Sequence, residues 1–284
     1  MKRPVVWALR LAFALAAVAI GGALWIYVAS EAHLRSFPRP PLFATAIDQS
    51  PDAIARGDHL VLTRGCRGCH GADLEGQVMW GYAVSANLRA YTRHESAATF
   101  EAALRHAIGA DGKALYSMPA FSFIHLRDGE VADIYAYLRN LPEGSHPLPH
   151  ASLPWSIRYD LARGADQAIP GFLHLVGPLT HQEDADARVA RGEYIAMTTC
   201  IECHGFSLRA DVPYPGENAP PLVIVAGYDE AAFRTLMKTG KALGDRELPM
   251  MSGVARGRFA NFTDDEVGDL YAFLSGFAAH EAAK

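Results

Sequence analysis

Cysteine is scarce in this sequence. Only four cysteines occur among its 284 residues, and all of them lie in two short runs at residues 66–70 and 200–204. No cysteine remains to cross-link the fold, which excludes the disulfide framework of a small secreted scaffold. A surplus of positive charge is missing as well. The formal net charge is −5, which argues against a nucleic-acid-binding surface, so we expect no nucleic-acid partner.

Both short runs have the pattern Cys-x-x-Cys-His, which is typical of covalent c-type haem attachment. In this pattern two thiols add to the haem vinyl groups, and the adjacent imidazole binds the iron. A zinc site would need four nitrogen or sulfur ligands, and each run supplies three residues with no second cysteine pair nearby. A redox dithiol would normally accompany a βαβ pattern, which the sequence lacks. The sequence therefore predicts two c-type haems, held by Cys66, Cys69, His70, Cys200, Cys203 and His204.

Methionines at similar spacings after each motif are candidates for the second axial ligand of the iron. Met118 lies 48 residues after His70. Met251 lies 47 residues after His204, and its neighbour Met250 is the alternative. A His–Met pair fills both axial positions and raises the reduction potential of the haem. The spacing therefore predicts His–Met ligation in both copies.

Other potential iron ligands are interpreted as structural. Met79 follows the first motif so closely that we assign it to packing. A lone histidine on a predicted helix or in a flanking loop usually serves the structure or faces solvent. This interpretation applies to His59, His94, His106 and His125.

The N-terminus predicts export and a membrane anchor. Residues 11–29 are 19 uncharged, mostly apolar residues, enough at about 1.5 Å per residue to cross roughly 30 Å of hydrocarbon. Basic residues precede them, which places the N-terminus in the cytoplasm and the rest of the chain outside. The alternative is a cleaved signal peptide. We expect an anchor or uncleaved signal over residues 1–32, and an extended, proline-rich tether over residues 33–52 that lifts the first domain off the membrane.

The rest of the chain contains an internal repeat. Residues 54–58 match residues 189–193 at an offset of 135, and the haem motifs follow at an offset of 134. Each copy ends in an amphipathic helix with apolar residues at i, i+3, i+4 and i+7, starting at Val131 and Val267. A further helical run lies in the middle of each copy, and convincing strands are absent. The repeat therefore predicts two similar all-α domains.

The predicted organisation is an N-terminal transmembrane helix followed by two tandem haem domains, at residues 53–143 and 185–284. So few apolar side chains could not build two substantial cores without a large planar ligand in each. Residues 144–184 form a long connection that contains several prolines together with aromatic and aliphatic residues. We expect this connection to be an interdomain strap that holds the two domains together.

Further short motifs support a family resemblance. They are Arg56-Gly57, Ala86-Asn87-Leu88, Met118-Pro119 and Asp128-Gly129-Glu130 in the first copy, and the corresponding residues 191–192, 219–222, 251 and 263–266 in the second. This combination resembles class I c-type cytochromes, and among them the membrane-attached cytochrome subunits of bacterial periplasmic dehydrogenases such as the alcohol dehydrogenases. The resemblance implies the cytochrome c fold, in which the first and last helices cross, with Gly57 and Gly192 permitting the close approach. Those subunits typically carry three haem domains, whereas this chain has two.

Together these features predict an electron-transfer protein and not an enzyme. We expect a di-haem cytochrome that relays single electrons between a periplasmic or membrane dehydrogenase, the donor, and a respiratory acceptor. The predicted location is the bacterial inner membrane, with a single pass and both haem domains on the periplasmic side. The alternative is a di-haem redox enzyme such as a peroxidase with one open iron. A suitably spaced methionine in each copy argues against it.

Overall fold

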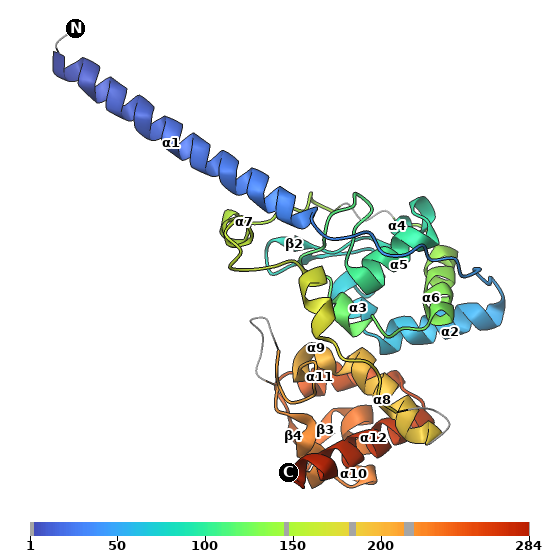
Figure 1. Cartoon of the computed structure of the whole chain (residues 1–284). Coiled ribbons are helices and arrows are strands. Elements are labelled where there is room, and N and C mark those ends of the chain that lie inside the picture. The colour runs from blue at the N-terminus through green and yellow to red at the C-terminus, as the bar shows by residue number, and fades with distance from the viewer. Residues whose placement is uncertain (1–2, 145–147, 182–185, 213–218, 284) are drawn as a thin grey trace.

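The protein is a mostly helical chain in which one long helix leads into two domains (Figure 1). The structure is a computed structural model that describes residues 3–144, 148–181, 186–212 and 219–283. The first part contains α1 (Arg3–Leu34), α2 (Pro51–Thr63), α3 (Cys66–His70), α4 (Leu88–His94), α5 (Ala97–His106), the 3-10 helix η1 (Ala120–Ser122) and α6 (Asp128–Asn140). The connection contains α7 (Trp155–Ala162) and η2 (Ile169–Leu175). The second domain contains α8 (Ala187–Thr199), α9 (Ile201–His204), η3 (Leu222–Gly227), α10 (Glu230–Thr239), α11 (Met251–Gly257), η4 (Phe259–Asn261) and α12 (Asp264–Ala282).

Strands contribute very little to the described residues. They form two antiparallel hairpins of two-residue strands, β1 (Val78–Met79) with β2 (Ala83–Val84), and β3 (Lys241–Ala242) with β4 (Arg246–Glu247). Hairpins this short cannot form a sheet with a buried face. The predicted all-α class is therefore confirmed, with these two turns as minor additions.

The first and last helices of each domain cross at a glycine. A Cβ atom added at Gly57 of α2 would lie 2.1 Å from the carbonyl oxygen of Asp133 in α6. One added at Gly192 of α8 would lie 2.0 Å from the carbonyl oxygen of Asp269 in α12. Neither distance leaves room for a side chain, because interiors are packed at van der Waals contact. The close crossing predicted at these two glycines is confirmed.

The arginine before each glycine binds the side chain of the same aspartate. Arg56 Nε lies 2.7 Å from Asp133 Oδ2, and Arg191 Nε lies 2.6 Å from Asp269 Oδ2. The aspartate side chains are only 12% and 7% exposed, so each needs a charged partner. Each Arg-Gly dipeptide therefore holds the crossing at two points, through a backbone contact and through an ion pair.

Side-chain caps define where the principal helices begin. The Ser50 side chain accepts a hydrogen bond from the Ala53 N–H at the start of α2. Asp186 caps α8 in the same way. Thr263 and Glu266 form a capping box at the start of α12. These side chains satisfy N–H groups that have no partner within the helix.

The last helix of each domain packs its predicted apolar stripe into the core, and a tyrosine on it makes an additional hydrogen bond. The Tyr135 hydroxyl donates to the carbonyl oxygen of Glu95 at 2.8 Å, and the Tyr271 hydroxyl donates to that of Tyr228 at 3.0 Å. These carbonyls lie directly before the caps of α5 and α10. The two tyrosines thus join the last helix of each domain to the middle one.

The predicted tether is extended but packed against the first domain. Residues 37–49 contain no helix or strand, as the prolines predict. Phe43 nevertheless packs against the core, and the guanidinium of Arg105 lies 5.8 Å from its ring centroid. The Ala114 N–H also donates to the carbonyl oxygen of Leu34 at 2.7 Å. The segment is therefore a packed element of the first domain, not a free spacer.

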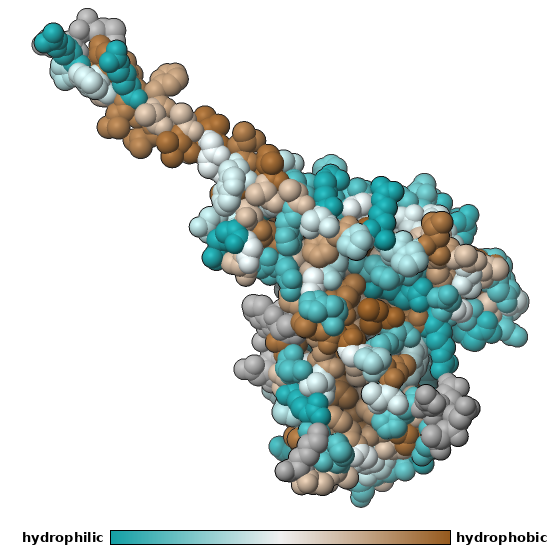
Figure 2. All heavy atoms as spheres, in the orientation of Figure 1, coloured by the Kyte–Doolittle hydropathy of each residue, from teal (hydrophilic) through white to brown (hydrophobic). Residues whose placement is uncertain are grey.

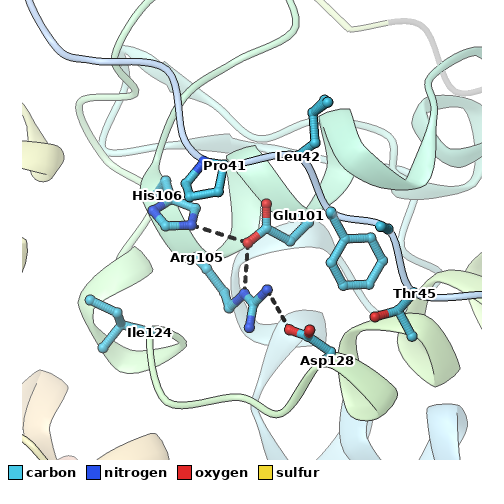
Figure 3. A pocket seen from close by; sticks show the side chains of 10 residues that line it. Pro41, Leu42, Thr45, Glu101, Arg105, His106, Ile124 and Asp128 are labelled. Carbon is cyan, nitrogen blue, oxygen red and sulfur yellow. Dashed lines mark hydrogen bonds and ion pairs between the residues drawn. The ribbon is translucent and has the colours of Figure 1, made fainter.

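An open cavity of about 550 Å³ lies between this segment and α5 (Figure 3). It contains an ionic cluster in which the Glu101 carboxylate lies 2.8 Å from Arg105 Nε and 3.1 Å from His106 Nε2. Arg105 also lies 2.8 Å from Asp128. Burial opposes ionisation of Glu101, but these partners hold its pKa below the usual range. The cluster fastens α5 to the start of α6.

Helix α1 projects away from both domains. It has 32 residues, and its most apolar 18-residue window has a mean hydropathy of 2.2 with none of it buried in the protein. Figure 2 shows hydrophobic surface along most of its length. By length and composition, α1 could cross a membrane.

The connection between the domains begins by packing α7 onto the end of α1. Arg158 of α7 lies 3.1 Å from the Glu31 carboxylate and donates to the Ser30 hydroxyl at 2.9 Å. Its guanidinium also lies 4.8 Å from the ring centroid of Tyr27. The last turns of α1 are thereby attached to the body of the protein.

The remainder of the connection contacts both domains. The Tyr116 hydroxyl of the first domain donates to Asp166 at 2.5 Å. Further along, the N–H groups of Thr180 and His181 donate to the Glu193 carboxylate of α8 at 2.9 and 2.7 Å. Burial alone would raise the pKa of Glu193, but these hydrogen bonds and that of the Thr180 hydroxyl hold it below the usual range.

The two domains also touch each other directly. His59 Nε2 of α2 lies 2.9 Å from the Glu266 carboxylate of α12. The rings of Phe121 and Phe206 lie 5.0 Å apart between centroids. One continuous cluster of buried apolar side chains includes residues of both domains. Figure 2 shows hydrophobic surface where the domains meet.

The close helix crossing predicts that a methyl group added at Gly57 or Gly192 destabilises the protein. We expect Gly57→Ala or Gly192→Ala to lower the free energy of unfolding of the haem-loaded protein by about 2 kcal/mol or more, because the helices must move apart. Gly129→Ala on α6 is the matched control, since a Cβ there would meet nothing within 4 Å. It should be neutral or slightly stabilising. Thermal unfolding measures all three, and equal losses at positions 57 and 129 would contradict the role of the crossing.

Candidate haem sites

The Cys-x-x-Cys-His motifs lie at the ends of α2 and α8, where the chain turns into α3 and α9. Gly65 adopts a left-handed conformation (φ 77°) immediately before Cys66, which turns the chain from α2 into α3. Burial raises the pKa of Cys66 to about 11, and it also raises the pKa values of Cys69 and Cys200. A redox dithiol depends on a lowered thiol pKa, so these thiols do not suit that chemistry.

The motif histidines are held in the tautomer that an iron ligand needs. Nδ1 of His70 lies 2.8 Å from the carbonyl oxygen of Ala86, and Nδ1 of His204 lies 2.7 Å from that of Pro220. A carbonyl oxygen can only accept, so Nδ1 carries the proton and Nε2 keeps a lone pair for a metal. Burial lowers the pKa of both imidazoles, although these hydrogen bonds oppose it, and so favours the neutral form.

The two carbonyl acceptors are functional residues whose role the sequence analysis missed. Each lies 16 residues after its histidine. Both belong to the short motifs at residues 86–88 and 219–222 that contributed to the family resemblance. The equal spacing was the signal that could have identified them.

A cavity of about 410 Å³ adjoins the first motif. Its lining combines the motif residues with apolar side chains, among them Leu88, Phe100, Leu104, Ile134 and Leu138. The volume lies within the range of cofactor sites. Two polar atoms of its lining, the Tyr91 hydroxyl and Arg64 Nε, are buried without a hydrogen-bond partner among the described residues. Apolar walls with two spare polar groups suit a haem, which is flat and apolar with carboxylates at one edge.

The methionines differ in how they are placed. Met79 and Met118 both line the first cavity. The sequence assigned Met79 to packing, and the structure places it in the cavity wall on the β1–β2 hairpin. Met118 packs against the buried core. In the second domain Met251 also packs against the core, whereas Met250 is 41% exposed.

The four other histidines that could have competed as ligands are engaged elsewhere. The nearest partners of their Nε2 atoms are Glu266 at 2.9 Å for His59, Glu143 at 3.0 Å for His94, Glu101 at 3.1 Å for His106, and the carbonyl oxygen of Gly177 at 2.9 Å for His125. Within the described residues, none of the four lines the first cavity. These hydrogen bonds agree with their structural interpretation.

Comparison with protein families decides whether the Cys-x-x-Cys-His motifs attach haem, bind zinc or form a redox dithiol. The cytochrome c family model matches this chain twice, at residues 54–142 and 189–277. Each match contains one Cys-x-x-Cys-His motif, and together they cover more than half of the chain. The chain belongs to the cytochrome c family. Its two cytochrome c domains carry two covalently bound c-type haems, as the sequence predicted.

Curated relatives of this cytochrome c include subunits of dehydrogenases. The chain is 28% identical to the fructose dehydrogenase cytochrome subunit of Gluconobacter japonicus, over 87% of this chain and 56% of the relative. It is 25% identical to the cytochrome c subunit of the quinone alcohol dehydrogenase of Gluconacetobacter polyoxogenes, over 82% of this chain and 58% of the relative. The chain thus spans a little over half the length of the relatives it matches. The predicted similarity to dehydrogenase cytochrome subunits is confirmed.

Proposed function

We propose that this cytochrome c relays single electrons from a dehydrogenase to a respiratory acceptor and is not itself an enzyme. The names of its relatives, cytochrome subunits of fructose and alcohol dehydrogenases, support a dehydrogenase as the donor. When bound, each haem supplies an iron that changes between the ferric and ferrous states. The residues of the chain attach the haems, supply the axial ligands and exclude water.

The contact between the two haem sites is the observation that carries this proposal. Glu202 lies between the two cysteines of the second motif and also lines the cavity of the first. Helix α9, which carries that motif, contacts η1 of the first domain. Because the second haem motif contacts the site of the first, electrons can pass between the two haems within one chain. An enzyme that works at a single open iron does not require such a contact between its haem sites.

The axial ligands that we assign are His70 with Met118, and His204 with Met251. Met118 is supported by its place in the cavity that holds the first motif. Met251 is supported over Met250 because a thioether ligand must be shielded from water, and Met250 is 41% exposed. With methionine in both sites, neither iron has an open position for peroxide chemistry.

The first ligand assignment predicts a change in one potential only. Met118→His should lower the potential of one haem by on the order of 100 mV and leave the other nearly unchanged, because imidazole stabilises ferric iron more than a thioether does. Met79→Leu, which changes the other cavity methionine, should leave both potentials nearly unchanged. Spectroelectrochemical titration measures both variants. A large shift with Met79→Leu and none with Met118→His would reverse the assignment.

The second ligand assignment predicts a difference between two neighbouring methionines. Met251→Leu should convert one ferric haem to the high-spin form and remove half of the weak near-infrared Met–iron band. Met250→Leu should leave the ferric spectrum unchanged. The opposite pattern in the two variants would assign Met250 as the ligand.

We propose that α1 anchors the protein in the bacterial inner membrane, with both haem domains in the periplasm. The apolar, unburied length of α1 and the basic residues before it support this orientation. Trp155 and Tyr159 of α7 give further support, since they are 57% and 48% exposed on a helix that packs against the end of α1. Tryptophan and tyrosine favour the membrane interface.

Isolation of the native membrane complex tests the proposed relay and its anchor together. We expect the full-length chain to stay in membranes through an alkaline wash, to need detergent for release, and to copurify with a dehydrogenase whose substrate reduces both haems. Release by the wash would contradict the anchor while leaving the relay open. A high-spin haem in the native protein that reacts with peroxide would contradict the relay and favour the di-haem peroxidase.

A further inference from the structure

Arg258 connects the two domains at the place where their haem motifs meet. It lies between α11 and η4 of the second domain, and its side chain is 12% exposed. Its Nε donates to the carbonyl oxygen of Thr63 in the first domain at 2.7 Å. Its Nη1 lies 3.9 Å from the Glu202 carboxylate of the second motif. Thr63 is the last residue of α2, three positions before Cys66.

The backbone of the first motif leaves space for this guanidinium. A Cβ atom added at Gly65 would lie 3.1 Å from Arg258 Nε, closer than ordinary van der Waals contact. Gly65 also has the left-handed φ of 77° that favours glycine. A glycine directly before Cys66 thus serves both the turn into α3 and the entry of an arginine from the other domain.

The charge of Arg258 reaches both haem attachment sites. Arg258 Nε binds the carbonyl oxygen of Thr63, three residues before Cys66, and Arg258 Nη1 lies 3.9 Å from Glu202, which stands between Cys200 and Cys203. These cysteines belong to both motifs. A single cation therefore lies within electrostatic range of the two covalent attachment edges.

The burial of this cation is incompletely compensated by protein groups. Nη2 of Arg258 and Nε of Arg64 are buried without a hydrogen-bond partner among the described residues. Glu202 is the acidic residue paired with Arg258, at the long distance of 3.9 Å. A buried charge with so little compensation destabilises a fold, and packing alone would be served better by an apolar side chain. The hydrogen bond to Thr63 and the Phe259 ring, 5.5 Å from the guanidinium, offset part of this cost, and a charge kept here points to a role beyond packing.

We propose that Arg258 is a positioning residue that holds the two haem attachment motifs together across the domain interface. Its positive charge would raise the reduction potentials of both haems together. Each reduction adds an electron beside a buried positive charge, and a low dielectric makes that interaction strong. Glu202 acts in the opposite direction at the same place. The inference rests on the proposed electron relay, but it requires only the two covalent haems and no particular donor or acceptor.

Redox titration of the purified full-length protein tests this role. We expect Arg258→Gln to lower both potentials, and Arg258→Lys to restore most of both because it keeps the charge. Arg256→Gln is the matched control, since Arg256 lies two residues away with its side chain 49% exposed beside Glu247. It should shift neither potential.

A shift of one potential alone, or equal shifts with Arg258→Gln and Arg258→Lys, would overturn the proposal. If Arg258→Gln does not fold, Glu202→Gln serves instead, because its side chain is 37% exposed. It should raise both potentials, and a lowered or unchanged pair would contradict the proposal. The titration uses chemical mediators, so failure to find a dehydrogenase partner would leave its result intact.

Discussion

The backbone contact of crossing helices is the constraint on which the rest of both domains depends. Because Gly57 and Gly192 let the first helix touch the last one, the C-terminal end of the first helix is held in one place. The haem motif follows within three residues of α2 and directly after α8. In the first domain the crossing therefore holds the two cysteines and the histidine of the motif at a cavity that the last helix also lines, through Ile134 and Leu138.

Equivalent residues make the same stabilising contacts in the two domains. In each, an arginine neutralises the aspartate at the crossing, a carbonyl oxygen orients the motif imidazole, and a tyrosine joins the last helix to the middle one. A duplicated sequence preserves these contacts because all of them lie within one copy. The copies differ at the methionines that follow the motif, since the first has Met118 followed by proline and the second has the adjacent Met250 and Met251.

The contacts at the junction between the domains are not repeated in the two copies. There, Arg258 and Arg64 come from different copies, and neither repeats the contacts of the other. Arg64 lines the cavity of the first motif, and Arg258 lies 3.9 Å from Glu202 of the second. Contacts within one copy therefore form each haem domain, whereas contacts between residues of different copies join the two domains.

The sequence by itself determined the haem motifs, the repeat and the all-α class, because each depends on residues close together in the chain or on a repeated spacing. The crossing at Gly57 and Gly192 followed from the family resemblance that these motifs carry. Only the tertiary structure decided the acceptors of the motif imidazoles, the packing of Phe43, the exposure of Met250 and the place of Arg258. These depend on contacts between residues far apart in sequence. The Nε of Arg258 and the carbonyl oxygen of Thr63 meet across 195 positions, a separation at which no local pattern carries a signal.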